Sequence, residues 1–366
     1  MAKIVTVYNS WRRAFAASDM SYIRWLKISE ALARRGHQVD IATNEWNWWQ
    51  KKSPIHLSNT LRRVPIAQVN WNDYDVVKTL FHVGFDTLEA YGGKNHPFII
   101  AKLGSVVGSQ DLEGIYFYGD KRRKLYSTQE KINRYSRYIT VLSEPARALW
   151  QKCFGTKNNI LLVRGGVDRD IPPPSRDPFP PGNHIRCLFA GHVYTRQSQP
   201  EANAVLINKL NKLGCLLSAY GAKLCFLGTG ELSQLDKNHV SYLGVASYEE
   251  AWNYFHFANV GVVVAAGKFN HNNESSKIYH YLRAGLPVVS EAGFPNDHVV
   301  SESRLGFVVE NNNFELMAKR IDEAAHKDWN RDYGINYILH NHTWDQRVEI
   351  YDKLLRANFS CNTTSR

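Results

Sequence analysis

The 366-residue sequence has no apolar run long enough to cross a membrane. A spanning helix needs about 20 consecutive apolar residues, and polar side chains interrupt every apolar stretch before that length. The first residues, M-A-K-I-V-T-V-Y, lack the charged, long apolar and small-residue segments of a signal peptide. The sequence therefore predicts a soluble cytoplasmic protein.

Cysteine is scarce and shows no pairing pattern. The five cysteines include no C-x-x-C pair, and most have apolar neighbours, among which a thiol acts as a small hydrophobic group. No zinc, haem or nucleophile-elbow pattern is present. The pair Gly228 and Gly230 lacks the third glycine and the ribose-binding acid of a dinucleotide oxidoreductase. We therefore expect no disulfide, no metal site and no redox cofactor.

Negative charge is in short supply only in the first half of the chain. Residues 1–170 hold 26 Lys and Arg against 15 Asp and Glu, a balance of +11, whereas residues 171–366 hold 19 of each sign. Such a field attracts nucleic acid, anionic lipid or acidic substrates. We expect no nucleic acid, since no stacking or groove-reading motif accompanies the charge. Residues 45–52, E-W-N-W-W-Q-K-K, are typical of a membrane interface or of a loop that covers the core.

The order of apolar runs and helical periods predicts an α/β protein with two doubly wound parallel sheets. Residues 171–182 hold six prolines, which exclude helix and sheet and indicate a boundary. We expect strands in the first half at residues 3–8, 38–43, 75–79, 98–103 and 138–142, and in the second half at 185–190, 223–227, 241–244, 260–264, 287–290 and 306–309. Helices are expected between them, for example at residues 21–35, 203–213, 249–257 and 316–325.

One stretch of the second half combines a helix start, a helix stop and a buried strand. Ser275 or Ser276 can cap the helix and Gly285 can end it, before the apolar run that begins at Leu286. Lys277 then lies in the first turn, where free N–H groups and the helix dipole favour an anion. The pattern predicts a phosphate site, with a solvated lysine on an ordinary helix as the alternative.

Motifs across the C-terminal half resemble those of GT-B glycosyltransferases, especially glycosyltransferase family 4 and its relatives. They are V-R-G-G-V-D at 163–168, L-F-A-G at 188–191, F-L-G-T-G-E at 226–231, S-K-I-Y-H-Y-L-R-A-G-L-P-V-V at 276–289 and a W-D helix from Trp344 to Leu355. The N-terminal half matches only in pattern. The resemblance implies two Rossmann-like domains that face each other across a cleft. Expected parts are an acceptor domain at 1–168, a linker at 169–182, a donor domain at 183–343, and a C-terminal helix and tail at 344–366 that pack back toward the first domain.

The resemblance also assigns the donor site. A nucleotide sugar, UDP- or GDP-linked, is expected as co-substrate, with the diphosphate at the glycine loop and at the start of the lysine helix, and without a metal. His280 falls where the family usually has the glutamate that holds the ribose, so His280 or its neighbour would take that role unless His280 is a satisfied, partly buried histidine. The expected donor-binding residues are Gly191, Arg196, Gly228, Tyr242, Val245, Ser276, Lys277, His280 and Tyr281.

Two acidic residues are candidate catalytic groups. Glu274 is a shifted counterpart of the family's first acid, and Asp111 follows the strand at 98–103, although it could equally be a cap or turn residue. Family resemblance favours retention of the anomeric configuration, and inversion with Asp111 as base is the alternative. The expected acceptor is a glycan, a lipid-linked molecule or another acceptor in cell-surface polysaccharide or glycoconjugate synthesis, and the anionic inner face of the membrane is a possible partner. Alternatives are a GT-B epimerase, a phosphorylase, or a non-catalytic nucleotide-sugar-binding subunit.

Overall fold

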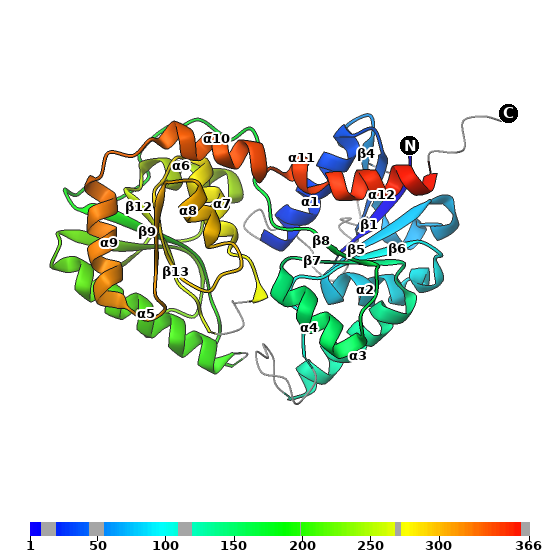
Figure 1. The fold of residues 1–366 in the computed structure, drawn as a ribbon, viewed down its shortest axis with the longest axis horizontal. Helices are drawn as coiled ribbons and strands as arrows, with labels where there is room; N and C mark the ends of the chain where they lie inside the picture. Colours follow the sequence, from blue (N-terminus) through cyan, green and yellow to red (C-terminus); the bar gives the residue numbers. More distant parts are fainter. Residues whose placement is uncertain (9–19, 44–54, 109–118, 198, 268–271, 360–366) are drawn as a thin grey trace, which may run out of the picture. The chain divides into compact units, whose positions relative to one another are not determined.

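The computed structural model describes residues 1–8, 20–43, 55–108, 119–197, 199–267 and 272–359 (Figure 1). The chain forms two compact units, one of Met1–Arg164 with Trp344–Arg366 and one of Gly165–Thr343. Each unit is an α/β domain built on a mainly parallel sheet. The predicted fold class is therefore confirmed.

The first unit contains an eight-stranded sheet of order β3-β4-β2-β1-β5-β6-β7-β8. All neighbouring strands are parallel except β3 and β4. The inner strands are largely apolar because both faces of a parallel sheet are covered. The strands are β1 Lys3–Val7, β2 Gln38–Thr43, β3 Ile55–His56, β4 Leu61–Pro65, β5 Val76–Leu80, β6 Ile99–Lys102, β7 Tyr138–Val141 and β8 Ile160–Leu162, and the helices are α1 Met20–Arg34, α2 Phe81–Ala90, α3 Gly119–Tyr135 and α4 Glu144–Phe154.

The last two helices of the chain, α11 (Trp344–Arg347) and α12 (Glu349–Phe359), pack on this same unit. Asp352 of α12 lies 2.9 Å from Nε2 of the buried His37, and Tyr351 shares a 3.0 Å hydrogen bond with Thr140 of β7. Arg34 at the end of α1 donates to Asp345. These contacts join residues more than 200 positions apart in sequence to one core.

The second unit contains a six-stranded sheet of order β11-β10-β9-β12-β13-β14, and all its neighbouring strands are parallel. Its first strand in sequence is therefore central, and the order reverses between β9 and β12. The strands are β9 Ile185–Val193, β10 Ala222–Gly230, β11 Val240–Tyr242, β12 Val260–Val263, β13 Val288–Glu291 and β14 Gly306–Val309. The helices are α5 Pro200–Ser218, α6 Tyr248–Phe257, α7 Ser276–Arg283, α8 His298–Glu302, α9 Phe314–His326 and α10 Arg331–Asn341.

Helices cover the two faces of this second sheet separately. The apolar stripe of α5 packs against β9 and β10, and that of α9 packs against β12, β13 and β14. Both helices share one continuous core, which includes Leu210, Phe226 and Ile321. Helices α7 and α8 lie on the other face (Figure 1). A fully buried leucine or phenylalanine side chain contributes about 1.5 to 3 kcal/mol, so this core holds the strand ends in place.

The proline-rich segment at 171–182 contains no helix or strand, as expected, but it packs as part of the second unit. The backbone N–H of Ser175 donates to Asn253 on α6 over 3.0 Å, and Phe179 packs edge-on against Tyr254 at 5.4 Å between ring centroids. The chain divides between Arg164 and Gly165 and not within the segment that was expected as a linker. Prolines restrict the unfolded segment, so docking it costs little entropy.

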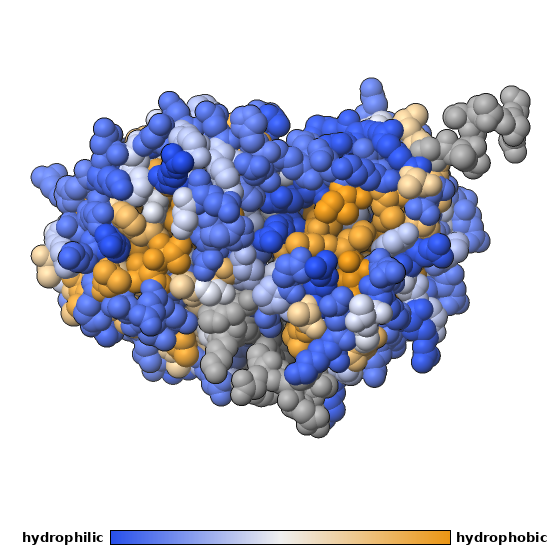
Figure 2. Space-filling model, in the orientation of Figure 1, coloured by the Kyte–Doolittle hydropathy of each residue, from blue (hydrophilic) through white to orange (hydrophobic). Residues whose placement is uncertain are grey.

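Hydrophilic side chains cover much of the surface of both units on the face shown in Figure 2, and hydrophobic residues gather there in separate patches. Among the described residues, no helix combines the length and the apolarity that a membrane span requires. Tyr242 and Val245 are large hydrophobic residues that are 47% and 56% exposed, close together in the chain after β11. Such neighbouring exposure is a common property of ligand-binding loops.

Candidate functional site

The candidate site lies at the carboxyl ends of β9 and β12, where the strand order of the second sheet reverses. From β9 the chain continues to α5, and from β12 it continues to α7 on the opposite face (Figure 1). Open α/β sheets bind ligands at such a switch point, because the diverging connections leave a crevice there. The groups available are the end of β9, the glycine-containing end of β10 and the first turn of α7.

The first turn of α7 is fixed by a buried amide. Asn296 accepts a hydrogen bond from the backbone N–H of Ser275 and donates one to its carbonyl, each over 2.9 Å. Ser275 is the N-cap residue, as predicted, but its hydroxyl does not cap the helix. That hydroxyl is buried and has no hydrogen-bond partner among the described residues. A buried polar atom without a partner costs about 1 to 3 kcal/mol, which a ligand at this helix end would offset.

Lys277 follows in the same turn and is half-buried. Its ammonium lies 5.0 Å from the centroid of the Phe189 ring, and no acidic group in the described part of the chain pairs with it. Burial lowers the pKa of Lys277 to about 8. A Cβ atom on Gly191 would lie 3.0 Å from the Lys277 Cε, so the glycine leaves room for the lysine stem. The result is an uncompensated positive charge beside a helix N-terminus.

Arg196 lies beyond β9 and, unlike Lys277, has an acidic partner. Its Nε is 3.0 Å from Oε1 of Glu231, and its backbone N–H donates to Oε2 of the same carboxylate over 2.8 Å. One terminal nitrogen donates to the Ser233 hydroxyl over 2.9 Å. Both expected diphosphate-binding cations are thus present at this edge of the sheet, one neutralised and one not.

Gly228 and the loop after β11 form one wall of the site at the glycine-containing end of β10. Gly228 has φ +144°, and a Cβ atom there would lie 1.8 Å from the Gly191 carbonyl oxygen, so no other residue fits. Its N–H donates to the Gly244 carbonyl over 2.8 Å, and its carbonyl accepts from the Tyr242 hydroxyl over 3.0 Å. These bonds place the exposed Tyr242 and Val245 next to the glycine-containing end of β10.

His280 and Tyr281, expected to hold the ribose, are core residues in the structure. His280 donates from Nδ1 to the Ser276 carbonyl over 2.6 Å, and its Nε2 accepts from the Tyr248 hydroxyl at 3.2 Å. The Tyr281 hydroxyl accepts from the Ala190 N–H over 2.7 Å, and its ring packs against Gly261. Both side chains are at most 4% exposed. Both ring nitrogens of His280 are thus bonded within the core, which is the alternative that the sequence left open for it, and the fully buried Tyr281 hydroxyl accepts the Ala190 bond.

Glu274 is buried at the start of the same segment. Its Oε2 accepts from the backbone N–H of Gly165 over 2.6 Å, which ties the loop before α7 to the V-R-G-G-V-D turn. The carboxylate is therefore oriented by the protein and not free to rotate. Asp111, the second candidate acid, lies outside the described residues. A search of the described residues finds no group of three His, Cys, Asp or Glu side chains that could hold a metal.

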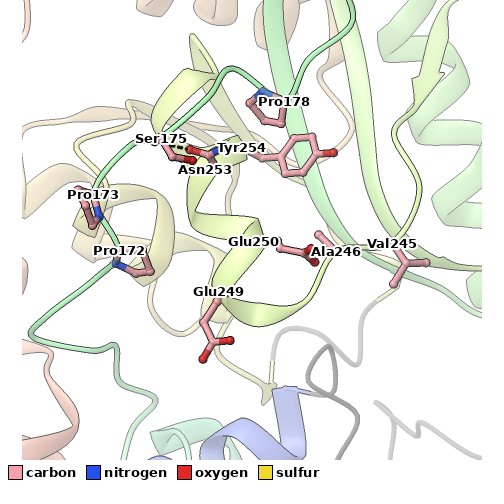
Figure 3. A pocket seen from close by; sticks show the side chains of 10 residues that line it. All are labelled: Pro172, Pro173, Ser175, Pro178, Val245, Ala246, Glu249, Glu250, Asn253 and Tyr254. Atoms are coloured by element: carbon pink, nitrogen blue, oxygen red, sulfur yellow. Dashed lines mark hydrogen bonds between the residues drawn. The ribbon is translucent and has the colours of Figure 1, made fainter.

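A separate open cavity of about 440 Å³ lies between the proline-rich segment and α6 (Figure 3). Its lining includes Val245 and Ala246, and it reaches Glu249 and Glu250 in the first turn of α6. None of the cations described above lines it. The cavity therefore borders the loop of the expected donor-binding residue Val245, while Lys277 and Arg196, the cations expected at the diphosphate, do not line it.

Sequence reasoning missed three residues that shape the site. Glu231 stands in the G-T-G-E motif, but its pairing with Arg196 is a tertiary contact over 35 positions. Ser233 has no distinguishing neighbours in the sequence. Asn296 follows F-P, a turn pattern, which gave no indication of its bonds to Ser275.

Comparisons with known proteins agree with this geometry. Residues 200–332 match the family model of the glucosyltransferase 3-like C-terminal domain. A sequence comparison with curated proteins finds no match.

Among solved structures, a sucrose-phosphate synthase from Thermosynechococcus elongatus superposes with a TM-score of 0.69 at 13% identity, over 98% of this chain and 100% of that one. The trehalose-6-phosphate synthase OtsA gives 0.68 at 10% identity, over 97% and 99%. Anabaena HepE in complex with UDP and glucose gives 0.65 at 11% identity, over 98% and 100%. The chain therefore has the GT-B glycosyltransferase fold, and its residues 200–332 match the C-terminal domain of glucosyltransferase 3-like proteins.

Proposed function

We propose that the protein transfers a sugar from a nucleotide-sugar donor to an acceptor. The observation that carries this proposal is Lys277, a half-buried ammonium at a helix N-terminus, with no acidic partner among the described residues. A desolvated charge is costly unless an anion meets it, and a diphosphate meets it with several oxygens. The glucosyltransferase 3-like match over residues 200–332 supports the same reaction.

Sugar transfer breaks the bond between the anomeric carbon and a phosphate oxygen, and the nucleoside diphosphate leaves with an added negative charge. Lys277 and Arg196 bind that charge more strongly in the transition state than in the ground state, which accelerates the step. The Ser275 hydroxyl, which lacks a partner among the described residues, can donate to the same anion. UDP- and GDP-sugars are the proposed donors, and the UDP bound to HepE makes UDP the first probe.

Retention of the anomeric configuration is the proposed outcome, with Glu274 as the oriented acid beside the donor helix. Inversion would instead need a base that removes the acceptor proton, for which Asp111 is the candidate. Assignment of the anomeric product by NMR decides between the two. If the product is inverted, Asp111→Asn should lower kcat by about 10²- to 10⁴-fold.

The proposed acceptor is a glycan or lipid-linked molecule of cell-surface polysaccharide or glycoconjugate synthesis, held by the basic first unit at the cytoplasmic face of a membrane. Each Lys or Arg near an anionic surface contributes about 1 kcal/mol, so several together give reversible attachment. The tryptophan and lysine stretch at 45–52 lies outside the described residues. Liposome flotation tests the proposal: binding should require anionic lipid, weaken with salt and fall in a Trp48→Ser, Trp49→Ser variant. A protein that stays soluble at low salt would instead take a soluble acidic acceptor.

The donor is tested by thermal shift with a panel of nucleotide sugars and free nucleotides. A ligand at 100 times its dissociation constant adds about 2.7 kcal/mol to the free energy of unfolding, which is readily measured as a higher Tm. Product analysis after incubation with the stabilising sugar nucleotide and acceptors then separates transfer from epimerisation and phosphorolysis. A chain that binds no nucleotide sugar would contradict the proposal.

One observation favours a second candidate, a non-catalytic subunit that binds nucleotide sugars. The position of the family's ribose-binding acid is occupied by His280, whose ring nitrogens are both bonded within the core. Donor binding without transfer to any acceptor, and without hydrolysis of the donor, would support this candidate over the enzyme.

A further inference from the structure

Arg196, one of the two proposed phosphate-binding cations, is held in place by contacts with neighbouring residues. The Glu231 carboxylate forms an ion pair with Nε of Arg196 through Oε1 and accepts from the Arg196 backbone N–H through Oε2. Ser233 accepts from one terminal nitrogen of the guanidinium. Two residues of one turn therefore contact a single arginine, at two of its three guanidinium nitrogens and at its backbone N–H.

The geometry leaves the guanidinium able to bind an anion. An arginine carries five N–H donors; the ion pair with Glu231 lies at Nε, and the bond to Ser233 uses one donor at Nη2. The remaining donors have no acceptor among the described residues. Arg196 can therefore bind a phosphate while both of its partners stay in place.

An arginine side chain that is already held in place binds a ligand more tightly than a mobile one. A free arginine loses rotamer entropy when a ligand immobilises it, and a side chain already held by neighbours loses less. The Arg196 side chain is 45% exposed, so without its partners it would move in solvent. The turn around Glu231 is itself anchored, because Asn203 on α5 donates to the Tyr194 carbonyl over 2.6 Å and to the Glu231 carbonyl over 3.4 Å.

We propose that Glu231, with Ser233, is a positioning residue that holds the Arg196 guanidinium ready for the donor diphosphate. This inference rests on the proposed function, since it presumes a nucleoside diphosphate at this edge of the sheet. Glu231 then acts only through Arg196 and only on ligands that carry phosphate. It does not touch the nucleoside, so the affinity for a nucleoside alone should not depend on it.

The test compares UDP with uridine, or GDP with guanosine if the wild type prefers guanine, by calorimetry and ligand-observed NMR. Glu231→Ala should weaken diphosphate binding about 5- to 20-fold, Ser233→Ala about 2- to 3-fold, and neither should change nucleoside affinity. In an Arg196→Gln background, Glu231→Ala should have less than a twofold effect, because its partner is gone. Glu323→Ala is the matched control: Glu323 pairs with Arg320 on α9 at similar exposure, and its loss should leave both affinities unchanged.

The outcomes separate the two levels of the proposal. If the wild type binds neither UDP nor GDP, the proposed function fails. If the wild type binds and Glu231→Ala weakens diphosphate and nucleoside equally, Glu231 merely supports the fold and the inference is overturned. Tighter diphosphate binding by Glu231→Gln would also overturn it, because the carboxylate would then compete with the phosphate for Arg196.

Discussion

The two units share a strand order but differ in what they place at the point where it reverses. In the first unit, β1 and β5 end at Tyr8 and Phe81, whose rings pack edge-on at 6.1 Å between centroids. Phe81 has φ +60°, a strained conformation for a bulky residue. In the second unit Gly191 lies near the end of β9, and the chain after β12 leads to Lys277 in α7. Similar sheets thus present an aromatic edge in one unit and a cationic edge in the other, and function depends on such side chains and not on the topology.

The comparison extends to lysines within each unit. Burial lowers the pKa of Lys78, in the middle of β5, to about 7, and that of Lys277 to about 8. Lys78 lies under the Tyr351 ring at 5.2 Å, inside the core, whereas Lys277 lies at the sheet edge. A desolvated charge is thus unfavourable in both places, but only the one at the edge can be met by a ligand.

Net charge separates the units further. By sequence the first unit holds 29 Lys and Arg against 16 Asp and Glu, or +13, and the second holds 16 against 18, or −2. The nearly neutral unit contains the proposed diphosphate site, so that site depends on two placed cations and not on a general field.

The largest expected effect is on stability, from Lys78→Met. At neutral pH the folded unit must deprotonate or desolvate this amine, and removing it should raise the free energy of unfolding by roughly 2 to 4 kcal/mol. In the wild type, the unfolded chain binds the extra proton between pH 7 and pH 10, so stability should rise with pH there and not in the variant. Chemical denaturation at pH 7 and pH 9 measures both.

Lys102→Met is the matched control for that prediction. Lys102 lies on the neighbouring strand β6, and its amine donates to the Val163 carbonyl over 2.8 Å. Its loss leaves a buried carbonyl with one acceptor bond fewer, so this variant should be destabilised by about 1 to 3 kcal/mol. Equal effects of the two substitutions would contradict the distinction between a partnered and an unpartnered buried lysine.

The next effect is on donor binding. Lys277→Ala should weaken nucleoside diphosphate binding by roughly 1.5 to 3 kcal/mol, about 10- to 100-fold, and Arg196→Ala by a similar factor. Calorimetric titration with UDP and GDP measures the loss. Lys237→Ala, an exposed lysine of the same unit, is the control and should bind as the wild type does. Wild-type affinity in both Lys277→Ala and Arg196→Ala would remove the basis of the proposed site.

The fold was largely readable from the sequence because its signals are local. The strand β12 is apolar throughout, and β9 and β13 contain short apolar runs, which are typical of a parallel sheet with two covered faces. The two glycines of G-T-G-E were also singled out, but they continue β10 to Gly230 instead of forming a turn, and Gly228 lies where no side chain fits. Lys277 was placed correctly in the first turn of α7 because a serine N-cap precedes it.

The ribose assignment of His280 came from its place in a family motif, and that place gives no measure of burial. In the structure five consecutive residues of α7, Ile278 to Leu282, are all buried. A helix covered on most sides leaves few of its polar groups free for a ligand. The hydrogen-bond partners of Arg196 and Ser275 could not be predicted from the sequence either. Each bond joins residues at least 21 positions apart and depends on how the loops pack.

A smaller effect is expected from pH on donor binding. As pH rises through about 8, Lys277 loses its proton in the free protein, while a bound diphosphate favours the protonated form. The phosphates stay ionised in this range, because their last pKa is about 6. UDP affinity should therefore fall by up to about tenfold per pH unit above pH 8. Titration from pH 6.5 to 9.5 tests this, and Lys277→Arg should flatten the profile; a wild-type profile that is flat would place Lys277 away from the phosphates.

The smallest expected effect concerns acid and only the first unit. His37 accepts from the Ala2 N–H at Nδ1 over 3.2 Å and donates from Nε2 to Asp352, so it is bound as the neutral imidazole. Burial is the main cause that lowers the pKa of His37, with the bond to Asp352 acting in the opposite direction. The pKa of His37 is lower in the folded state than in the unfolded state. As pH falls below about 6.5, the unfolded state therefore takes up the proton first, and the stabilisation present above that pH is lost.

The acid effect should appear where His37 joins α12 to the rest of the unit. Opening of α12, followed by amide hydrogen exchange corrected for intrinsic rates, should increase by up to about tenfold per pH unit below 6.5. Exchange in β9 and β12 of the second unit should change less, because no part of this contact lies there. In His37→Gln, whose side-chain amide can replace one of the two bonds but cannot titrate, α12 should open more readily at neutral pH and lose most of the pH dependence. Acid sensitivity that persists in that variant would assign the effect to the carboxylate of Asp352. That carboxylate also forms ion pairs with Arg35 and Arg356.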